Sequence, residues 1–118
     1  MINKIAKKYN INLHKVKAGD KYCKANGIDT YLNKSYSSGS KNHNPEIWLG
    51  IYYDKELKLI SFFHELGHIL CKRKESDTIY QMEEKAWKKG IKIANKYEIF
   101  FSDETLKWSK NQLKSYEK

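Results

Sequence analysis

The apolar residues in the first half of the chain follow short, changing periods. Residues 2–9 carry apolar side chains at helical spacing, which predicts a short helix. In residues 11–16 apolar and polar side chains alternate, as they do in a half-buried strand. Residues 46–53 are rich in aromatic and β-branched side chains and predict a well-buried strand. The first half is therefore expected to contain a helix and a small sheet.

Turn residues separate these elements. Asn26-Gly27 is the strongest two-residue hairpin signal in the chain, so we expect a hairpin around it. Residues 33–45 are small, polar and rich in turn formers, and they end on Pro45. This composition predicts a mobile loop.

The second half is predicted to be helical. A helix begins at Asp54, a good N-cap, and runs to about Lys72; it is apolar on nearly all sides, as a buried helix is. A second helix covers residues 78–97, and a third begins near Ser102. The inward face of the second helix is predicted to hold Ile79, Tyr80, Glu83, Ala86, Trp87, Gly90, Ile91 and Ala94. Together the elements predict one α+β domain over residues 1–118, with an antiparallel or mixed sheet packed on helices.

The composition is that of a soluble globular protein. There is no apolar run of the roughly 18 residues that a membrane-spanning helix needs, and no signal peptide is visible at the start. Cys23 and Cys71 form neither a disulfide framework nor a CxxC pair. We therefore expect two reduced thiols in a cytoplasmic protein that does not contact a membrane.

The formal net charge of +9 raises the question of nucleic-acid binding. Of the 23 basic residues only Arg73 is an arginine, although contacts to base edges and bidentate contacts to phosphate favour arginine. We therefore expect a lysine-rich solvated surface. Direct nucleic-acid binding is the alternative that we do not favour.

The strongest chemical signal is the H-E-x-x-H pattern formed by His64-Glu65-Leu66-Gly67-His68. On a helix the two histidines lie one turn apart on one face, so both imidazoles can bind one metal ion. Glu65 lies about 100° further round the helix, where it can contact a metal-bound water without being a ligand. This arrangement predicts a catalytic zinc site.

A catalytic zinc ion needs a third protein ligand and one open position. Glu83 is the only carboxylate on the otherwise apolar face of the next helix, so we expect it to be that ligand, in preference to Glu84. Ala86 and Gly90 are small, which predicts a close approach of this helix to another.

The predicted site implies peptide hydrolysis with Glu65 as the general base. A second group has to stabilise the transition state, and Tyr80 and His43 are both candidates. Peptidases with this motif commonly hold the substrate backbone by strand addition. The strand predicted at residues 46–53 directly precedes the motif helix and is the candidate for this role.

With His64-Glu65-Leu66-Gly67-His68 followed by Glu83-Glu84-Lys85-Ala86-Trp87, the sequence resembles the ImmA/IrrE family of zinc metallopeptidases. Members are common in prophages and other bacterial mobile DNA. The family pattern is HELGH followed by E-x-x-A on the next helix, and its glutamate, here Glu83, is the third zinc ligand. The resemblance covers about residues 46–97.

The resemblance implies a small zincin-like domain, in which the HExxH helix and a following Glu-bearing helix hold Zn2+. It also implies a narrow protein substrate, namely a DNA-binding repressor of a phage or mobile element. Two other classes stay open on the sequence: a zinc-stabilised regulator that binds a repressor without cutting it, and a basic nucleic-acid-binding domain. The presence of Glu65 favours the enzyme.

Overall fold

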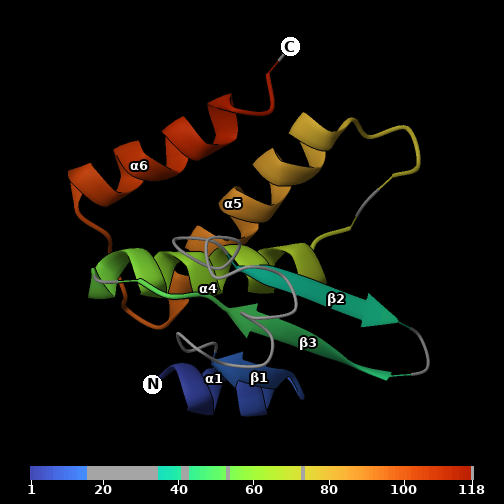
Figure 1. Ribbon diagram of the computed structural model, residues 1–118, viewed down its shortest axis with the longest axis vertical. Coiled ribbons are helices and arrows are strands. Elements are labelled where there is room, and N and C mark those ends of the chain that lie inside the picture. The colour runs from blue at the N-terminus through green and yellow to red at the C-terminus, as the bar shows by residue number, and fades with distance from the viewer. Residues whose placement is uncertain (16–34, 41–42, 53, 73, 118) are drawn as a thin grey trace. The chain divides into compact units, whose positions relative to one another are not determined.

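A computed structural model describes residues 1–15, 35–40, 43–52, 54–72 and 74–117 (Figure 1). Within these residues the elements are α1 (Ile2–Lys8), β1 (Asn12–Lys15), β2 (Tyr36–Ser40), β3 (His43–Leu49), α4 (Lys55–Leu70), α5 (Ile79–Lys96) and α6 (Asp103–Lys114). The described part of the chain is therefore an α+β fold with a mixed sheet, as predicted. It divides into two compact units, Met1–Phe62 and Phe63–Lys118, whose boundary lies inside α4.

β3 is the middle strand of the sheet. It pairs in parallel with β1 on one side and antiparallel with β2 on the other (Figure 1). Ile47 and Leu49 are 0% exposed, whereas Glu46 and Trp48, which alternate with them, are half-buried. One face of β3 therefore supplies the core, and the predicted strand at residues 46–53 is confirmed up to Leu49.

The prediction of a loop over residues 33–45 is wrong, because β2 and the start of β3 occupy most of it. Pairing to a neighbouring strand outweighs the turn-forming composition of this segment, since strand preference depends strongly on context. Pro45 has no N–H to donate, and it is tolerated because β1 pairs with β3 only from Glu46 onward. On the other side, the pairing with β2 is irregular between Ser38 and Ser40.

β3 is also not the edge strand that we expected to bind a substrate backbone. Among the described residues, β1 pairs with Glu46–Leu49 while β2 pairs with the opposite side of the same strand. Strand addition needs an exposed sheet edge. The expectation that residues 46–53 bind substrate in this way is therefore wrong for β3.

α4 begins at Asp54, as predicted. The Asp54 Oδ1 atom accepts hydrogen bonds from the backbone N–H groups of Glu56 and Leu57, at 2.8 and 3.0 Å. Every residue from Ile60 to Gly67 is buried. The prediction of a helix buried on all sides is confirmed for this stretch, which contains most of the HExxH motif.

α6 begins at its predicted N-cap, Ser102, and α5 begins next to Thr78, where the second helix was predicted to start. The Thr78 hydroxyl accepts from the backbone N–H of Gln81, whose side chain accepts from the backbone N–H of Thr78, so the two form a capping box. The Ser102 hydroxyl accepts from the backbone N–H of Thr105 at 3.3 Å. These caps fix where the two helices start.

The buried face of α5 differs from the predicted one at its ends. It comprises Ala86, Trp87, Gly90, Ile93 and Ala94. Ile79 was placed on this face but is 60% exposed, and it lines a surface pocket together with Thr78 and Tyr80. Ile93 is buried in place of Ile91, which lies at the margin of the face and is half-buried.

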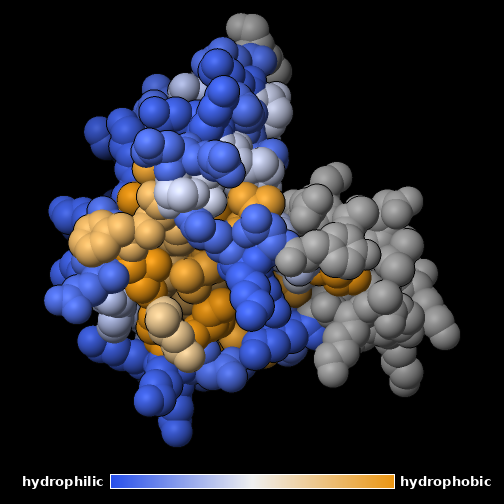
Figure 2. Space-filling model, turned by 90° about the vertical axis from the view of Figure 1, so that its left-hand side faces the viewer, coloured by the Kyte–Doolittle hydropathy of each residue, from blue (hydrophilic) through white to orange (hydrophobic). Residues whose placement is uncertain are grey.

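Most lysines of α5 lie on its solvent side: Lys88, Lys89, Lys92 and Lys96 are exposed, and Lys85 is half-buried. Figure 2 shows one face of the molecule, on which hydrophilic residues surround an area of hydrophobic residues. Within the described ranges, none of the helices has the length and apolar character to cross a membrane. The hairpin predicted at Asn26-Gly27 and the thiol of Cys23 lie outside these ranges.

Candidate metal centre

Glycines let α4 and α5 cross in close contact. A Cβ atom at Gly67 would overlap the carbonyl oxygen of Ala86, and a Cβ atom at Gly90 would overlap the carbonyl oxygen of Phe63. The close approach predicted from Ala86 and Gly90 is therefore confirmed. Gly67, the matching residue on α4, was not predicted to allow this approach. Its signal was a glycine inside a helix, which is unfavourable unless packing requires it.

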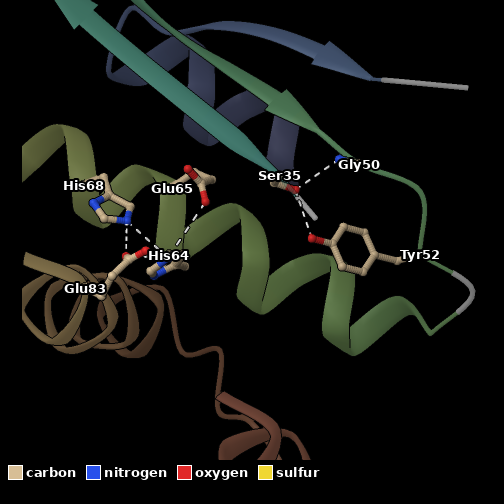
Figure 3. Close-up of polar contacts among 7 residues, drawn as sticks. All are labelled: Ser35, Gly50, Tyr52, His64, Glu65, His68 and Glu83. Carbon is tan, nitrogen blue, oxygen red and sulfur yellow. Dashed lines mark hydrogen bonds and ion pairs between the residues drawn. The ribbon is translucent and has the colours of Figure 1, made fainter. Parts of the chain in front are cut away.

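This crossing brings together three side chains that could bind a metal ion (Figure 3). The Nε2 atoms of His64 and His68 are 3.2 Å apart. Glu83 Oε2 lies 3.2 Å from His64 Nε2 and 2.5 Å from His68 Nε2. Ligand atoms at zinc-bond length around a tetrahedral ion are separated by about 3.3 Å. Two of the three separations match this value, and the third would have to lengthen by less than about 1 Å.

Hydrogen bonds among the described residues do not satisfy the cluster. Glu83 lies within ion-pair distance of both imidazoles, yet its buried Oε2 atom makes no hydrogen bond of acceptable geometry, and neither does the buried Nδ1 atom of His64. A buried carboxylate oxygen needs a partner. A cation between the three atoms would be that partner, and two imidazoles with one carboxylate form a donor set suited to zinc. These three residues could therefore hold a metal ion.

The environment of His64 and Glu83 favours the protonation states in which these side chains bind a metal ion. Burial lowers the pKa of His64; Glu83 raises it in part and His68 lowers it again. Burial raises the pKa of the Glu83 carboxyl, but the two imidazoles lower it by more, so that the pKa lies well below its usual range. A neutral His64 and an ionised Glu83 are the forms that coordinate a cation.

Glu65 lies beside this cluster without joining it (Figure 3). It follows His64 directly on α4 and is 6% exposed. Its Oε2 atom is 3.9 Å from His64 Nε2, while the three close donor atoms come from the two histidines and Glu83. The position fits a group that acts on a molecule bound at the cluster.

Glu84, the alternative third ligand, lies elsewhere. Its side chain is 38% exposed, and its Oε1 atom is 3.9 Å from Lys88 Nζ. The arrangement therefore brings Glu83, and not Glu84, to the two histidines.

Tyr80, one of the two candidates for transition-state stabilisation, does not belong to the cluster of three donor residues. Tyr80 lines a surface pocket with Thr78, Ile79, Tyr116 and Glu117. Burial raises the pKa of Tyr80, and the carboxylates of Glu117 and Glu84 raise it further. His43 is the first residue of β3, and its side chain lies outside the described part of the structure. Both roles stay predictions.

The chain matches no protein-family model, and it has no significant match among curated proteins or solved structures. Its function is therefore inferred from the arrangement of its own residues.

Proposed function

We propose that the protein is a zinc-dependent endopeptidase, with His64, His68 and Glu83 as the metal ligands and Glu65 as the general base. The observation that supports this most is the convergence of three donor atoms within 4.8 Å of one another, supplied by the HExxH helix and the next helix. The buried Glu65 beside them separates this proposal from that of a purely structural metal site, which has no use for a base.

Bound zinc would lower the pKa of a coordinated water towards about 7 and polarise the carbonyl of the scissile bond. His64 and His68 would present neutral Nε2 atoms, and Glu83 an anionic oxygen. Glu65 would accept the proton of the attacking water and then donate it to the leaving amine. Tyr80 or His43 would stabilise the negative charge that develops on the carbonyl oxygen.

The resemblance to the ImmA/IrrE family supports a specific cytoplasmic protein substrate, and a DNA-binding repressor of a phage or mobile element is the substrate we propose. Two sequence features support this family assignment: the HELGH motif and the E-x-x-A run of Glu83 and Ala86.

Metal content tests the site. We expect about one zinc per chain in the unaltered protein, in Glu65→Gln and in Glu84→Gln, and a clear loss in Glu83→Gln. Loss in the Glu84 variant alone would move the third ligand by one residue. A protein that takes up no zinc when zinc is supplied would overturn the proposal and favour a basic nucleic-acid-binding domain, whose DNA affinity should depend steeply on salt and not on chelator.

Cleavage tests the reaction. A repressor encoded beside the gene for this protein is the natural substrate for the assay, with Glu65→Gln as the matched negative control. Binding of a repressor by the zinc-loaded protein without cleavage would favour the non-catalytic regulator instead.

A further inference from the structure

One ligand of the candidate metal centre is not oriented by a hydrogen bond. A histidine that binds a metal through one ring nitrogen ordinarily donates a hydrogen bond through the other, and this bond fixes the plane of the ring. In His64 the Nε2 atom points at Glu83 and His68, but Nδ1 is buried and has no hydrogen-bond partner among the described residues. Something else must hold the ring in place.

An aromatic ring lies directly against it. The indole of Trp87 stacks on the imidazole of His64, with ring centroids 3.8 Å apart and planes inclined by 20°. Trp87 is one helical turn after Glu83 on α5, so one face of one helix supplies both the carboxylate and the stacked ring. The imidazole is thus held at its Nε2 edge by Glu83 and on its flat face by Trp87.

Trp87 is itself held in place. It is 7% exposed, and the indole of Trp108 from α6 packs edge-on against it at 6.1 Å and 88°. Trp87 Nε1 makes no hydrogen bond with the part of the chain that the structure describes. The position of Trp87 therefore depends on the packing of its ring. Through this packing, the position of α6 affects the position of the His64 imidazole.

We infer that Trp87 is a positioning residue of the metal centre. Its ring fixes the plane of the His64 imidazole so that Nε2 faces the space shared with His68 and Glu83, and it replaces the hydrogen bond to Nδ1 that usually does this. This inference rests on the proposed function, because it assumes that the cluster binds a metal.

Two substitutions separate stacking from mere filling of space. Trp87→Phe keeps a flat aromatic face, whereas Trp87→Met keeps apolar volume without one. Zinc and cobalt affinities are measured by competition with a chromogenic chelator, after far-ultraviolet circular dichroism has shown that each variant is folded. Trp48→Phe, in the other unit, is the matched control for loss of a tryptophan.

We expect Trp87→Met to weaken metal binding about 10- to 100-fold, as loss of a group that orients a ligand does. Trp87→Phe should recover most of that loss, and Trp48→Phe should bind as the unaltered protein does. The d–d absorption of bound cobalt should also change in the Met variant. A folded Met variant with unaltered affinity, or equal losses in the Phe and Met variants, would overturn the inference.

If Trp87→Met does not fold, quenching of tryptophan fluorescence by cobalt tests the inference instead. In a Trp48→Phe/Trp108→Phe protein the emission comes from Trp87 alone and should be quenched by one equivalent of cobalt; unchanged emission with cobalt bound would overturn the inference. An unaltered protein that binds no zinc would end both the proposed function and this inference. Zinc binding without proteolysis would end only the former.

Discussion

Gly67 of α4 lies so close to the carbonyl oxygen of Ala86 of α5 that no side chain fits between them. Gly67 stands between the two histidines of the motif, and Ala86 is three residues after Glu83. The contact between the helices therefore sets the distance between the imidazoles and the carboxylate. The small size of Gly67 is therefore needed for His64, His68 and Glu83 to lie close together.

Gly67→Ala should destabilise the protein, although alanine is normally favoured over glycine inside a helix by about 1 kcal/mol. The new methyl group overlaps a backbone oxygen, which cannot move away as a flexible side chain could. We expect a net loss of about 1–3 kcal/mol in the free energy of unfolding of the metal-free protein, measured with urea. Zinc affinity should fall as well, because separation of the helices moves Glu83 away from the histidines.

The control for this substitution is Asn95→Ala, at an exposed position of α5. It adds the same helix-favouring residue without a clash and should not destabilise the protein. A Gly67→Ala variant at least as stable as the unaltered protein would show that the two helices are not in close contact.

Zinc should stabilise the folded protein, and the stabilisation should grow with the logarithm of the free zinc concentration above its Kd. A ligand that binds only the folded state at 1,000 times its Kd adds about 4 kcal/mol to the free energy of unfolding. We therefore expect added zinc to raise the midpoint of thermal unfolding, and a chelator to reverse the rise. The shift should be much smaller in Glu83→Gln and unaltered in Glu84→Gln, whose side chain lies away from the cluster. Equal shifts in both variants would argue against Glu83 as a ligand.

The helix starts and the grouping of His64, His68 and Glu83 could be predicted from the sequence because their signals are local. Asp54, Thr78 and Ser102 are cap residues whose side chains bond to the backbone within three positions, so each helix start is encoded next to itself. His64 and His68 are placed by the helical period alone. Glu83 stood out as the single carboxylate on an apolar face.

The features that could not be predicted depend on contacts between distant residues. β2 consists of Tyr, Ser and Gly, and its pairing with β3 supplies a structure that its composition does not indicate. The central place of β3 follows from β1, more than thirty residues earlier in the chain. Trp87 was assigned to the inward face of α5, but its stacking on His64 requires the crossing of two helices.

Glu65→Gln should abolish peptide cleavage while leaving zinc binding and stability nearly unaltered. The amide keeps the size of the side chain but cannot accept the proton of the attacking water. Glu65 Oε2 lies 3.9 Å from His64 Nε2, outside the group of three close donors, so its loss should not remove a ligand. Zinc content and product formation are measured on the same preparation. Loss of zinc in this variant would mean that Glu65 is a ligand and not the base.

Asp77 links the segment before α5 to the helix itself. Its Oδ2 atom accepts hydrogen bonds from the backbone N–H of Lys74 at 2.9 Å and from Lys85 Nζ at 2.7 Å. The backbone N–H of Lys74 and then the Lys85 ammonium group lower the pKa of Asp77, and burial offsets only part of this. Because the pKa is lower in the folded state than in the unfolded state, the ionised carboxylate stabilises the fold.

This contribution should be fully present above the unfolded-state pKa of about 3.9 and should be lost as the pH falls through the folded-state pKa. Asp77→Asn should therefore be less stable than the unaltered protein at pH 7, and the difference should shrink at pH 3. Urea unfolding of both metal-free proteins at the two pH values measures this, with Glu75→Gln as the control for loss of one exposed carboxylate nearby. The amide of Asp77→Asn can still accept the hydrogen bond from Lys74, so the substitution removes mainly the charge. If the two proteins differ in stability by the same amount at both pH values, the charge of Asp77 does not contribute.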